Sequence, residues 1–165
     1  MVCHQGGAKN ACFVGGVRWQ FRAADVFEGM NIHYTDTKDF DPAVLGALYS
    51  SQGWKSGGFP DALAAAMSGS DTVISAWDGD KLVGLASVLS DGHLVAYLSY
   101  LLVHPDYQGR AIGDGLMERV VARYKKCLRK VLISFDDKAG FYERYGFKQG
   151  KGRTPMYLRE YDTPY

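Results

Sequence analysis

The stretch from Val103 to Gly113, which reads VHPDYQGRAIG, has the composition of a phosphate-binding loop. An apolar run ends at Pro105, a loop containing Gly109 follows, and an amphipathic pattern begins at Ile112. The start of a helix leaves about four backbone N–H groups without intrahelical partners and carries roughly half a positive charge. A diphosphate can bind there with few cationic side chains, so the spacing indicates a phosphorylated cofactor. The alternative is that Gly109 and Gly113 only make a tight strand-to-helix turn.

Two elements must position this loop. Residues 97–103 form an aromatic and apolar run of strand length. After the loop, apolar residues recur at helical spacing, which predicts a helix over 112–126. Its apolar face holds Ile112, Leu116, Met117, Val120, Val121 and Tyr124. The loop therefore joins a buried strand to a surface helix.

Two ordered segments carry a family resemblance. Residues 108–113, QGRAIG, are similar to the signature Gln/Arg-x-x-Gly-x-Gly/Ala of the GNAT superfamily of acyl-CoA-dependent N-acetyltransferases. Residues 136–147 resemble, with small shifts in spacing, a second family motif, Asn-x-x-Ala-x-x-Phe/Leu-Tyr-x-x-x-Gly-Phe. The resemblance covers about residues 31–160. Residues 48–54 also resemble the first helix of a branch that acetylates small amines.

The resemblance implies that acetyl-CoA is the cosubstrate. In this family a splayed strand offers a backbone N–H to the tetrahedral oxyanion, and that position maps to Leu102 or its neighbours Leu101 and Val103. Arg110 lies in the loop itself and is the simplest partner for a peripheral phosphate. The expected cofactor-binding residues are Leu101, Leu102, Val103, Gln108, Gly109, Arg110, Ala111, Ile112, Gly113, Asp114 and Asp136.

Two of these residues depart from the family pattern. Ala111 stands where Gly is usual, and we expect helical backbone dihedrals there, so that the methyl group costs nothing and adds helix propensity. Asp136 stands at the usual Asn, which replaces a donor and acceptor with a carboxylate that only accepts at neutral pH. This exchange weakens any contact of residue 136 with pantetheine.

The implied reaction is direct attack of a primary amine on the thioester of acetyl-CoA. An aliphatic amine has a pKa of about 10.4 in water, so the neutral form must be selected or generated. The acidic side chain that the family often carries on the strand before the loop is replaced here by Tyr97, Ser99 and Tyr100. No base is assigned, and His93, His104 and a water relay remain alternatives.

The departing thiolate needs a proton, since a thiol of this kind has a pKa of about 8.5. A positioned phenol can supply it, and the second motif places Tyr142 in that role. The alternative is that Tyr142 is a core aromatic on a turn with Phe141 and Tyr145.

An aromatic or alkyl amine would fit an apolar slot lined by Tyr49, Trp54, Phe59 and Tyr97, although core packing explains the same residues. The leading hypothesis is an N-acetyltransferase of small-molecule amines. The alternatives are acetylation of a protein or peptide amine and a non-catalytic CoA-binding module. The last is motivated by Ala111, Asp136 and the missing acidic base.

The composition predicts a soluble domain. The chain has 165 residues, 47% apolar content and a net charge of +1, which gives no electrostatic footprint for nucleic acid. No apolar run approaches the roughly 20 residues that span a bilayer, and no secretory signal opens the chain, so we expect a cytoplasmic protein without membrane contact. Cys3, Cys12 and Cys127 are scattered without metal-ligand spacing, so no metal is expected.

Residues 1–29 are interrupted by glycine pairs, and we expect them to be an extension of uncertain order before a single domain over 30–165. The alternative is an extra strand over 13–14 and 17–21 that packs on the domain or on a second subunit. The family often dimerises, so a homodimer is a further expectation.

The domain itself is predicted as an α/β (α+β) fold with a mixed, mostly antiparallel central sheet and helices on both faces. The expected strands are 31–35, 72–77, 81–89, 94–103, 130–135 and a closing strand near 155–160, and the expected helices are 42–52 capped by Asp41, 61–67, 112–126 and 138–145.

Overall fold

The computed structural model describes residues 13–14, 17–18, 31–150, 152, 154–156 and 158. Contacts divide the chain into two units, Met1–Met30 and Asn31–Tyr165. In the first unit, strand β1 (Phe13–Val14) pairs antiparallel with β2 (Val17–Arg18). All the other described helices and strands belong to the second unit.

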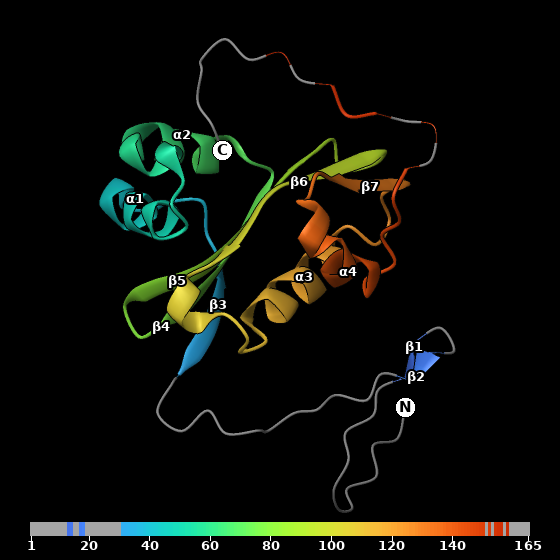
Figure 1. The fold of residues 1–165 in the computed structure, drawn as a ribbon, viewed down its shortest axis with the longest axis horizontal. Helices are drawn as coiled ribbons and strands as arrows, with labels where there is room; N and C mark the ends of the chain where they lie inside the picture. Colours follow the sequence, from blue (N-terminus) through green and yellow to red (C-terminus); the bar gives the residue numbers. More distant parts are fainter. Residues whose placement is uncertain are drawn as a thin grey trace, which may run out of the picture. The chain divides into compact units, whose positions relative to one another are not determined.

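The second unit is built on a five-stranded sheet in the order β3-β4-β5-β6-β7 (Figure 1). The first four strands are antiparallel, and β7 runs parallel to β6. The expected mixed, mostly antiparallel sheet is therefore confirmed. The strands are β3 (Ile32–Asp36), β4 (Thr72–Asp78), β5 (Lys81–Ser90), β6 (Val95–Val103) and β7 (Arg129–Leu132).

Helices cover both faces of this sheet, as expected (Figure 1). Helices α1 (Pro42–Ser51) and α2 (Pro60–Gly69), joined by the 3-10 turn η1 (Lys55–Gly58), lie on one face. Helices α3 (Ile112–Arg123) and α4 (Ala139–Glu143) lie on the other. The short turns η2 (Pro105–Tyr107) and η3 (Asp136–Lys138) precede them.

The start of α1 follows the sequence prediction. Asp41 has an extended backbone, and its carboxylate accepts a hydrogen bond from the backbone N–H of Ala43 at 2.8 Å. This N-cap satisfies one of the N–H groups that the helix cannot pair internally, and Pro42 at the first position needs no partner.

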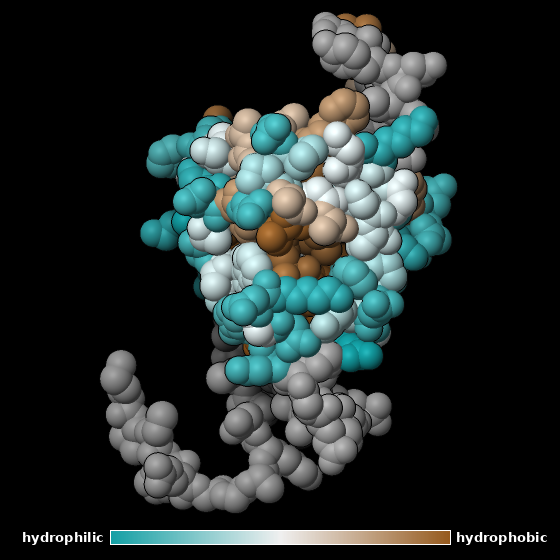
Figure 2. Space-filling model, turned by 90° about the vertical axis from the view of Figure 1, so that its left-hand side faces the viewer, coloured by the Kyte–Doolittle hydropathy of each residue, from teal (hydrophilic) through white to brown (hydrophobic). Residues whose placement is uncertain are grey.

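Two apolar clusters lie on opposite sides of the sheet. One joins α3 to the sheet through residues such as Leu98, Leu116 and Met117. The other joins α1 and α2 to the sheet through residues such as Leu45 and Leu85. On the surface that Figure 2 shows, apolar side chains gather near the middle and hydrophilic ones surround them. Burial of both clusters is what holds the strand ends at fixed positions around the site.

Strand β6 contains a β-bulge at Ser99. Ser87 of β5 is opposite Tyr100, but the next residue, Val88, is opposite Leu98, so Ser99 has no partner of its own on β5. An inserted residue reverses the alternation of side chains along a strand. Consequently Ala96 and Leu98 face α3 before the bulge, whereas after it Leu101 and Val103 face α3, and Tyr100 and Leu102 face α1 and α2.

Several expected boundaries are corrected. Helix α3 ends at Arg123 rather than at residue 126, because Tyr124 leaves helical dihedrals and its hydroxyl bonds Asp71 and Thr72. Strand β7 covers 129–132 rather than 130–135. The helix expected over 138–145 is shorter, because η3 occupies 136–138 and α4 covers only 139–143. Of the closing strand expected near 155–160, only residues 155, 156 and 158 are described, and they are not in a strand.

No helix in the described part of the chain is long and apolar enough to cross a membrane.

Candidate active site

Strands β6 and β7 separate partway along β6. Their parallel pairing runs from Val95 with Arg129 to Leu98 with Leu132 and then stops, while β6 continues beside β5 as far as Val103. A cleft of about 630 Å³ opens where they diverge. It is lined by the second half of β6, the start of α3, residues 132–135, α4 and the segment after α1.

The backbone of β6 directs particular N–H groups into this cleft. The N–H of His104 donates to the carbonyl of Val83 at 2.8 Å, which makes Gly84 and Val103 a non-hydrogen-bonded pair. Antiparallel pairs alternate, so Leu102 exchanges its hydrogen bonds with β5. The N–H groups of Leu101 and Val103 therefore point to the opposite edge, which β7 has left. Of the three residues proposed to hold an oxyanion, these two have the suitable orientation.

The start of α3 supplies a second row of donors. The N–H groups of Ile112, Gly113 and Asp114 precede the first intrahelical hydrogen bond, which Gly115 makes to Ala111 at 3.0 Å. Within the described residues no acceptor reaches them. Three convergent N–H groups at the positive end of a 12-residue helix form a site for an anion.

The prediction of helical backbone dihedrals at Ala111 is wrong. Ala111 has φ 57° and ψ 11° and is the single non-glycine residue with positive φ in the described part of the chain. The loop must reverse after Gly109, which also has positive φ, before α3 can begin. This left-handed conformation costs an alanine about 1 kcal/mol or more, which is why glycine is usual at such positions.

The carbonyl oxygen of Val103, at the end of β6, accepts two side-chain hydrogen bonds. It accepts a hydrogen bond from Nε2 of Gln52 at 2.9 Å and another from Nε2 of Gln108 at 3.1 Å. Gln52 caps the C-terminus of α1, and Gln108 belongs to the loop before α3. One backbone oxygen thus ties both sides of the cleft to the same strand.

Two cations gather at the outer end of the loop. Nζ of Lys81 lies 5.0 Å, and the guanidinium carbon of Arg110 5.6 Å, from the centre of the Tyr107 ring. The Tyr107 hydroxyl donates to Asp78 at 3.0 Å, and this bond raises the pKa of the phenol. The ring therefore holds two positive charges near the anion site by cation–π contact.

Tyr142 lies on α4 and lines the cleft. Its ring packs edge-on against Phe141, with centroids 5.0 Å apart, and against Phe147 at 6.3 Å. Burial raises the pKa of the Tyr142 phenol, so the hydroxyl keeps its proton at neutral pH. Within the described residues this hydroxyl makes no hydrogen bond, which leaves its proton available to a ligand.

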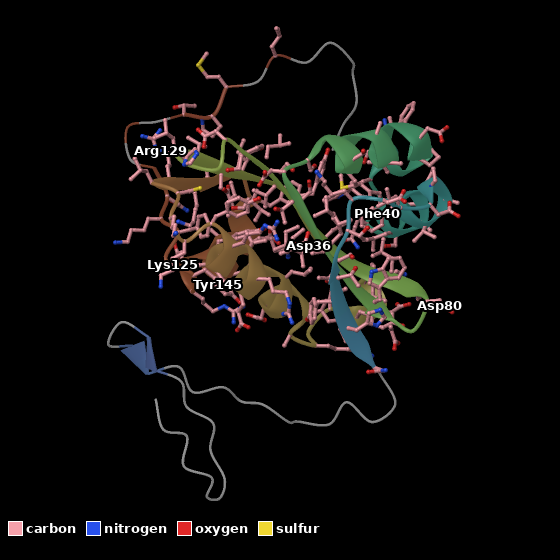
Figure 3. All side chains as sticks on the ribbon, turned by 180° about the vertical axis from the view of Figure 1, so that it is seen from behind. Asp36, Phe40, Asp80, Lys125, Arg129 and Tyr145 are labelled. Atoms are coloured by element: carbon pink, nitrogen blue, oxygen red, sulfur yellow. The ribbon has the colours of Figure 1, made fainter. Side chains whose placement is uncertain are left out.

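Asp114 connects α3 to the segment after α4. It accepts a hydrogen bond from the Tyr145 hydroxyl at 2.6 Å and pairs with Arg144 at 3.0 Å. Tyr145 is labelled in Figure 3, on the side of the sheet that α3 and α4 cover. Burial and this bond to a carboxylate raise the pKa of Tyr145. Asp114 is thereby held by two partners, and it stabilises the placement of α4 rather than serving as an uncommitted base.

An aromatic wall closes the cleft on the side of α1. The centroids of Trp54 and Tyr100, which both line it, are 6.2 Å apart. Tyr49 lies behind them at 0% exposure, 5.3 Å from Tyr100 and 5.7 Å from Trp54. The buried Tyr49 hydroxyl has no hydrogen-bond partner among the described residues, and burial strongly raises its pKa.

Residues 46–154, which include every residue that lines the cleft, match a family model described as "Acetyltransferase (GNAT) domain". The chain belongs to the GNAT family of acetyltransferases.

Individual relatives agree with this assignment. The chain is 25% identical over 132 residues to the ycf52 protein of Pyropia yezoensis, an uncharacterized N-acetyltransferase, with 76% of this chain and 75% of that protein covered. A GNAT-family acetyltransferase from Streptococcus pneumoniae TIGR4 is 25% identical with a TM-score of 0.69 over 79% of this chain and all of that one. An aminoglycoside N-acetyltransferase in complex with CoA shares the fold at 16% identity, with a TM-score of 0.60, 82% of this chain and 99% of that chain covered.

Most of the expected site residues line the cleft. They are Trp54, Leu101, Leu102, Val103, Gln108, Gly109, Ala111, Ile112, Gly113, Asp114 and Tyr142. The loop and the two motifs are brought together because β6, α3 and α4 meet where β7 diverges. Their chemical roles stay predictions.

Five expected site residues lie elsewhere. Arg110 is beside Tyr107, and Asp136 is exposed on η3 between two lining residues. Tyr49 is buried behind the wall, Phe59 is 59% exposed at the start of α2, and Tyr97 precedes the bulge, opposite Leu89. Aromatic composition alone does not distinguish core, cleft and surface.

The two histidines considered as bases are also outside the cleft lining. His93 is exposed before β6. His104 packs against Tyr107, and its Nδ1 accepts the N–H of Asp106 at 3.3 Å.

Sequence reasoning missed several lining residues: Gln52, Ser99, Tyr100, Leu132, Ile133, Ser134, Phe135, Lys138, Phe141 and Arg144. Local signals existed for four of them: Gln52 follows an apolar helix and precedes Gly53 and Trp54, and Lys138, Phe141 and Arg144 lie within the second motif. The others depend on the bulge at Ser99 and on where β7 separates, and neither is encoded by a short motif.

Proposed function

We propose that this GNAT protein transfers the acetyl group of acetyl-CoA to the primary amine of a small molecule by direct attack. The observation that carries the proposal is the cleft between β6 and β7, which has backbone donors on two walls. One row, at the start of α3, suits a diphosphate, and the other, on β6, suits an oxyanion. The relative that binds CoA with the same fold supports acetyl-CoA as the cosubstrate.

The residues would act in sequence. The N–H groups of Ile112, Gly113 and Asp114 bind the diphosphate, which directs the acyl end toward β6. The amine nitrogen attacks the carbonyl carbon of the thioester and forms the new C–N bond. The N–H of Leu101 or Val103 stabilises the negative charge on the carbonyl oxygen.

Collapse of this intermediate breaks the C–S bond. The sulfur leaves with the bonding electron pair and takes the proton of the Tyr142 hydroxyl, while the amine nitrogen loses one proton to water. Tyr142 is suited to this role because burial keeps its phenol protonated and the hydroxyl is uncommitted within the described chain. Proton return through solvent restores the phenol.

Trp54 and Tyr100 favour a small acceptor. They form a wall that one aromatic or alkyl group can cover, whereas a peptide needs an open groove. Acetylation of a protein or peptide amine remains the alternative, and comparing CoA release with peptides and with small amines separates the two.

Calorimetric titration with acetyl-CoA tests the cofactor site. A β-carbon at Gly113 would meet Phe141 at 3.5 Å, an ordinary contact, so Gly113→Ala is the matched control for Gly113→Glu. We expect micromolar binding to the wild type and to Gly113→Ala. Binding should be lost in Gly113→Glu, whose carboxylate occupies the diphosphate position. Equal binding to all three proteins would contradict the proposed site.

A further inference from the structure

Gln52 lines the cleft, and its side-chain oxygen has no hydrogen-bond donor among the described residues. Its Nε2 lies 2.9 Å from the carbonyl oxygen of Val103, and a carbonyl oxygen can only accept. The atom at this contact must therefore be the amide nitrogen, which fixes the orientation of the side-chain amide.

The second hydrogen of the amide is also used. Nε2 lies 3.3 Å from Oγ of Ser51, and the Ser51 hydroxyl donates its own hydrogen to the carbonyl of Leu48 at 2.7 Å. The hydroxyl oxygen is thus an acceptor for Gln52. Both hydrogens of the amide are committed to the protein, and Oε1 is left without a donor among the described residues.

The position of Gln52 determines which ligand would meet Oε1. Gln52 ends α1 and lines the cleft on the same side as Trp54 and Tyr100, across the sheet from the start of α3. The diphosphate is anionic and is expected at α3, where donors are presented. A lone acceptor beside an aromatic wall instead suits a group that carries N–H.

On the basis of the proposed function, we infer that Oε1 of Gln52 accepts a hydrogen bond from the attacking primary amine and orients its lone pair toward the thioester. The substrate class is then a primary amine with an apolar substituent against Trp54 and Tyr100. One N–H bonds Gln52, and the other is the hydrogen lost as a proton during transfer.

Gln108 provides a matched control. It donates to the same carbonyl of Val103 but belongs to the loop before α3 that is proposed to bind the cofactor. Gln52→Met and Gln108→Met each remove one amide and keep the side-chain length. We expect Gln52→Met to lower kcat/KM for the amine by 10- to 100-fold and to leave the Kd of acetyl-CoA within about twofold, because one hydrogen bond of about 1–3 kcal/mol is lost. Gln108→Met should instead weaken acetyl-CoA binding.

A comparison of two substrates distinguishes contact of Gln52 with the amine from a purely structural role of Gln52. The panel is 2-phenylethylamine, tyramine, putrescine and glucosamine, and the best of these is compared with its N-methyl analogue, which has one N–H instead of two. The wild type should prefer the primary amine, and this preference should shrink at least about fivefold in Gln52→Met. Gln52→Asn, which withdraws the amide by one methylene, gives the same readout if Gln52→Met does not fold.

The outcomes are distinguishable. Turnover with an unchanged primary-to-N-methyl ratio in the variant would overturn the role of Gln52 alone. No CoA release by the wild type with any amine of the panel, despite acetyl-CoA binding, would overturn the proposed function and the role of Gln52 with it.

Discussion

Ala111 is the last residue of the loop before α3 and has a left-handed backbone conformation. Its left-handed backbone lets the chain turn from Gly109 into α3 without a side-chain cap. The N–H groups that follow are left facing the cleft. A small conformational cost at one residue therefore accompanies the exposure of the donors that the proposed diphosphate needs.

Ala111→Gly should stabilise the protein by about 1 kcal/mol, because glycine adopts positive φ without steric cost. Ala122→Gly is the control, since Ala122 lies within α3 and the same change should destabilise the fold by roughly 0.5–1 kcal/mol. Urea unfolding of both variants measures the two effects. A destabilised Ala111→Gly would mean that residue 111 is helical in solution.

Tyr142→Phe should lower kcat by about 10²-fold or more and change the Kd of acetyl-CoA little, because only the proton donor is removed. Tyr145→Phe is the comparison, since its hydroxyl bonds Asp114 and does not line the cleft. Steady-state CoA release with a saturating amine gives both values. Unchanged turnover in Tyr142→Phe would leave Tyr142 as a packing residue.

At the scale of the elements, the sequence predicted much of the fold. Apolar runs of strand length and the Asp41 cap located the strands and α1, because each is a local effect. The bulge at Ser99 was missed because one serine in an apolar run leaves the pattern unchanged. The conformation of Ala111 and the end of α3 were also missed, since tertiary contacts decide both.

Tyr124 connects the end of α3 to the start of β4 through hydrogen bonds of its hydroxyl. Its buried hydroxyl bonds Asp71 and Thr72, and burial followed by the bond to Asp71 raises its pKa to about 12. The folded protein holds this proton more tightly than the unfolded chain, whose tyrosine pKa is about 10. The stabilisation is therefore complete below pH 10 and is lost as the pH rises from about 10 to about 12.

Unfolding free energies measured from pH 8 to pH 11.5 test this. Tyr124→Phe should cost about 1–3 kcal/mol at pH 8 and flatten the alkaline decline of stability. Tyr107→Phe is the control, because Tyr107 also bonds a carboxylate and has a raised pKa but is only half-buried. A decline of equal steepness in Tyr124→Phe would assign the alkaline loss to other groups.

At the scale of the whole molecule, every residue that lines the cleft lies between Gln52 and Arg144. The division of contacts at Met30 separates this region from the first unit. From the sequence, the poor periodicity of residues 1–29 predicts a single domain over 30–165, and this assignment stays a prediction.

We expect a chain that begins at Met30 to bind acetyl-CoA as the full chain does. At a concentration of 100 times Kd, the ligand should stabilise either protein by about 2.7 kcal/mol, which raises Tm by roughly 5–10 °C for a chain of this size. Thermal denaturation with and without acetyl-CoA measures the shift. A smaller shift in the shortened chain would show that residues 1–29 contribute to the site.

The extra residue in β6 changes the path of the strand rather than the side chains that it presents. Leu98 and Tyr100 are opposite consecutive residues of β5, so a chain without Ser99 would restore regular alternation and keep Tyr100 facing α1 and Leu101 facing α3. Such a chain would lose the bend and the added twist that a bulge gives to a strand. A homologous chain with a gap at this position would therefore present the same side chains to a cleft with differently angled walls.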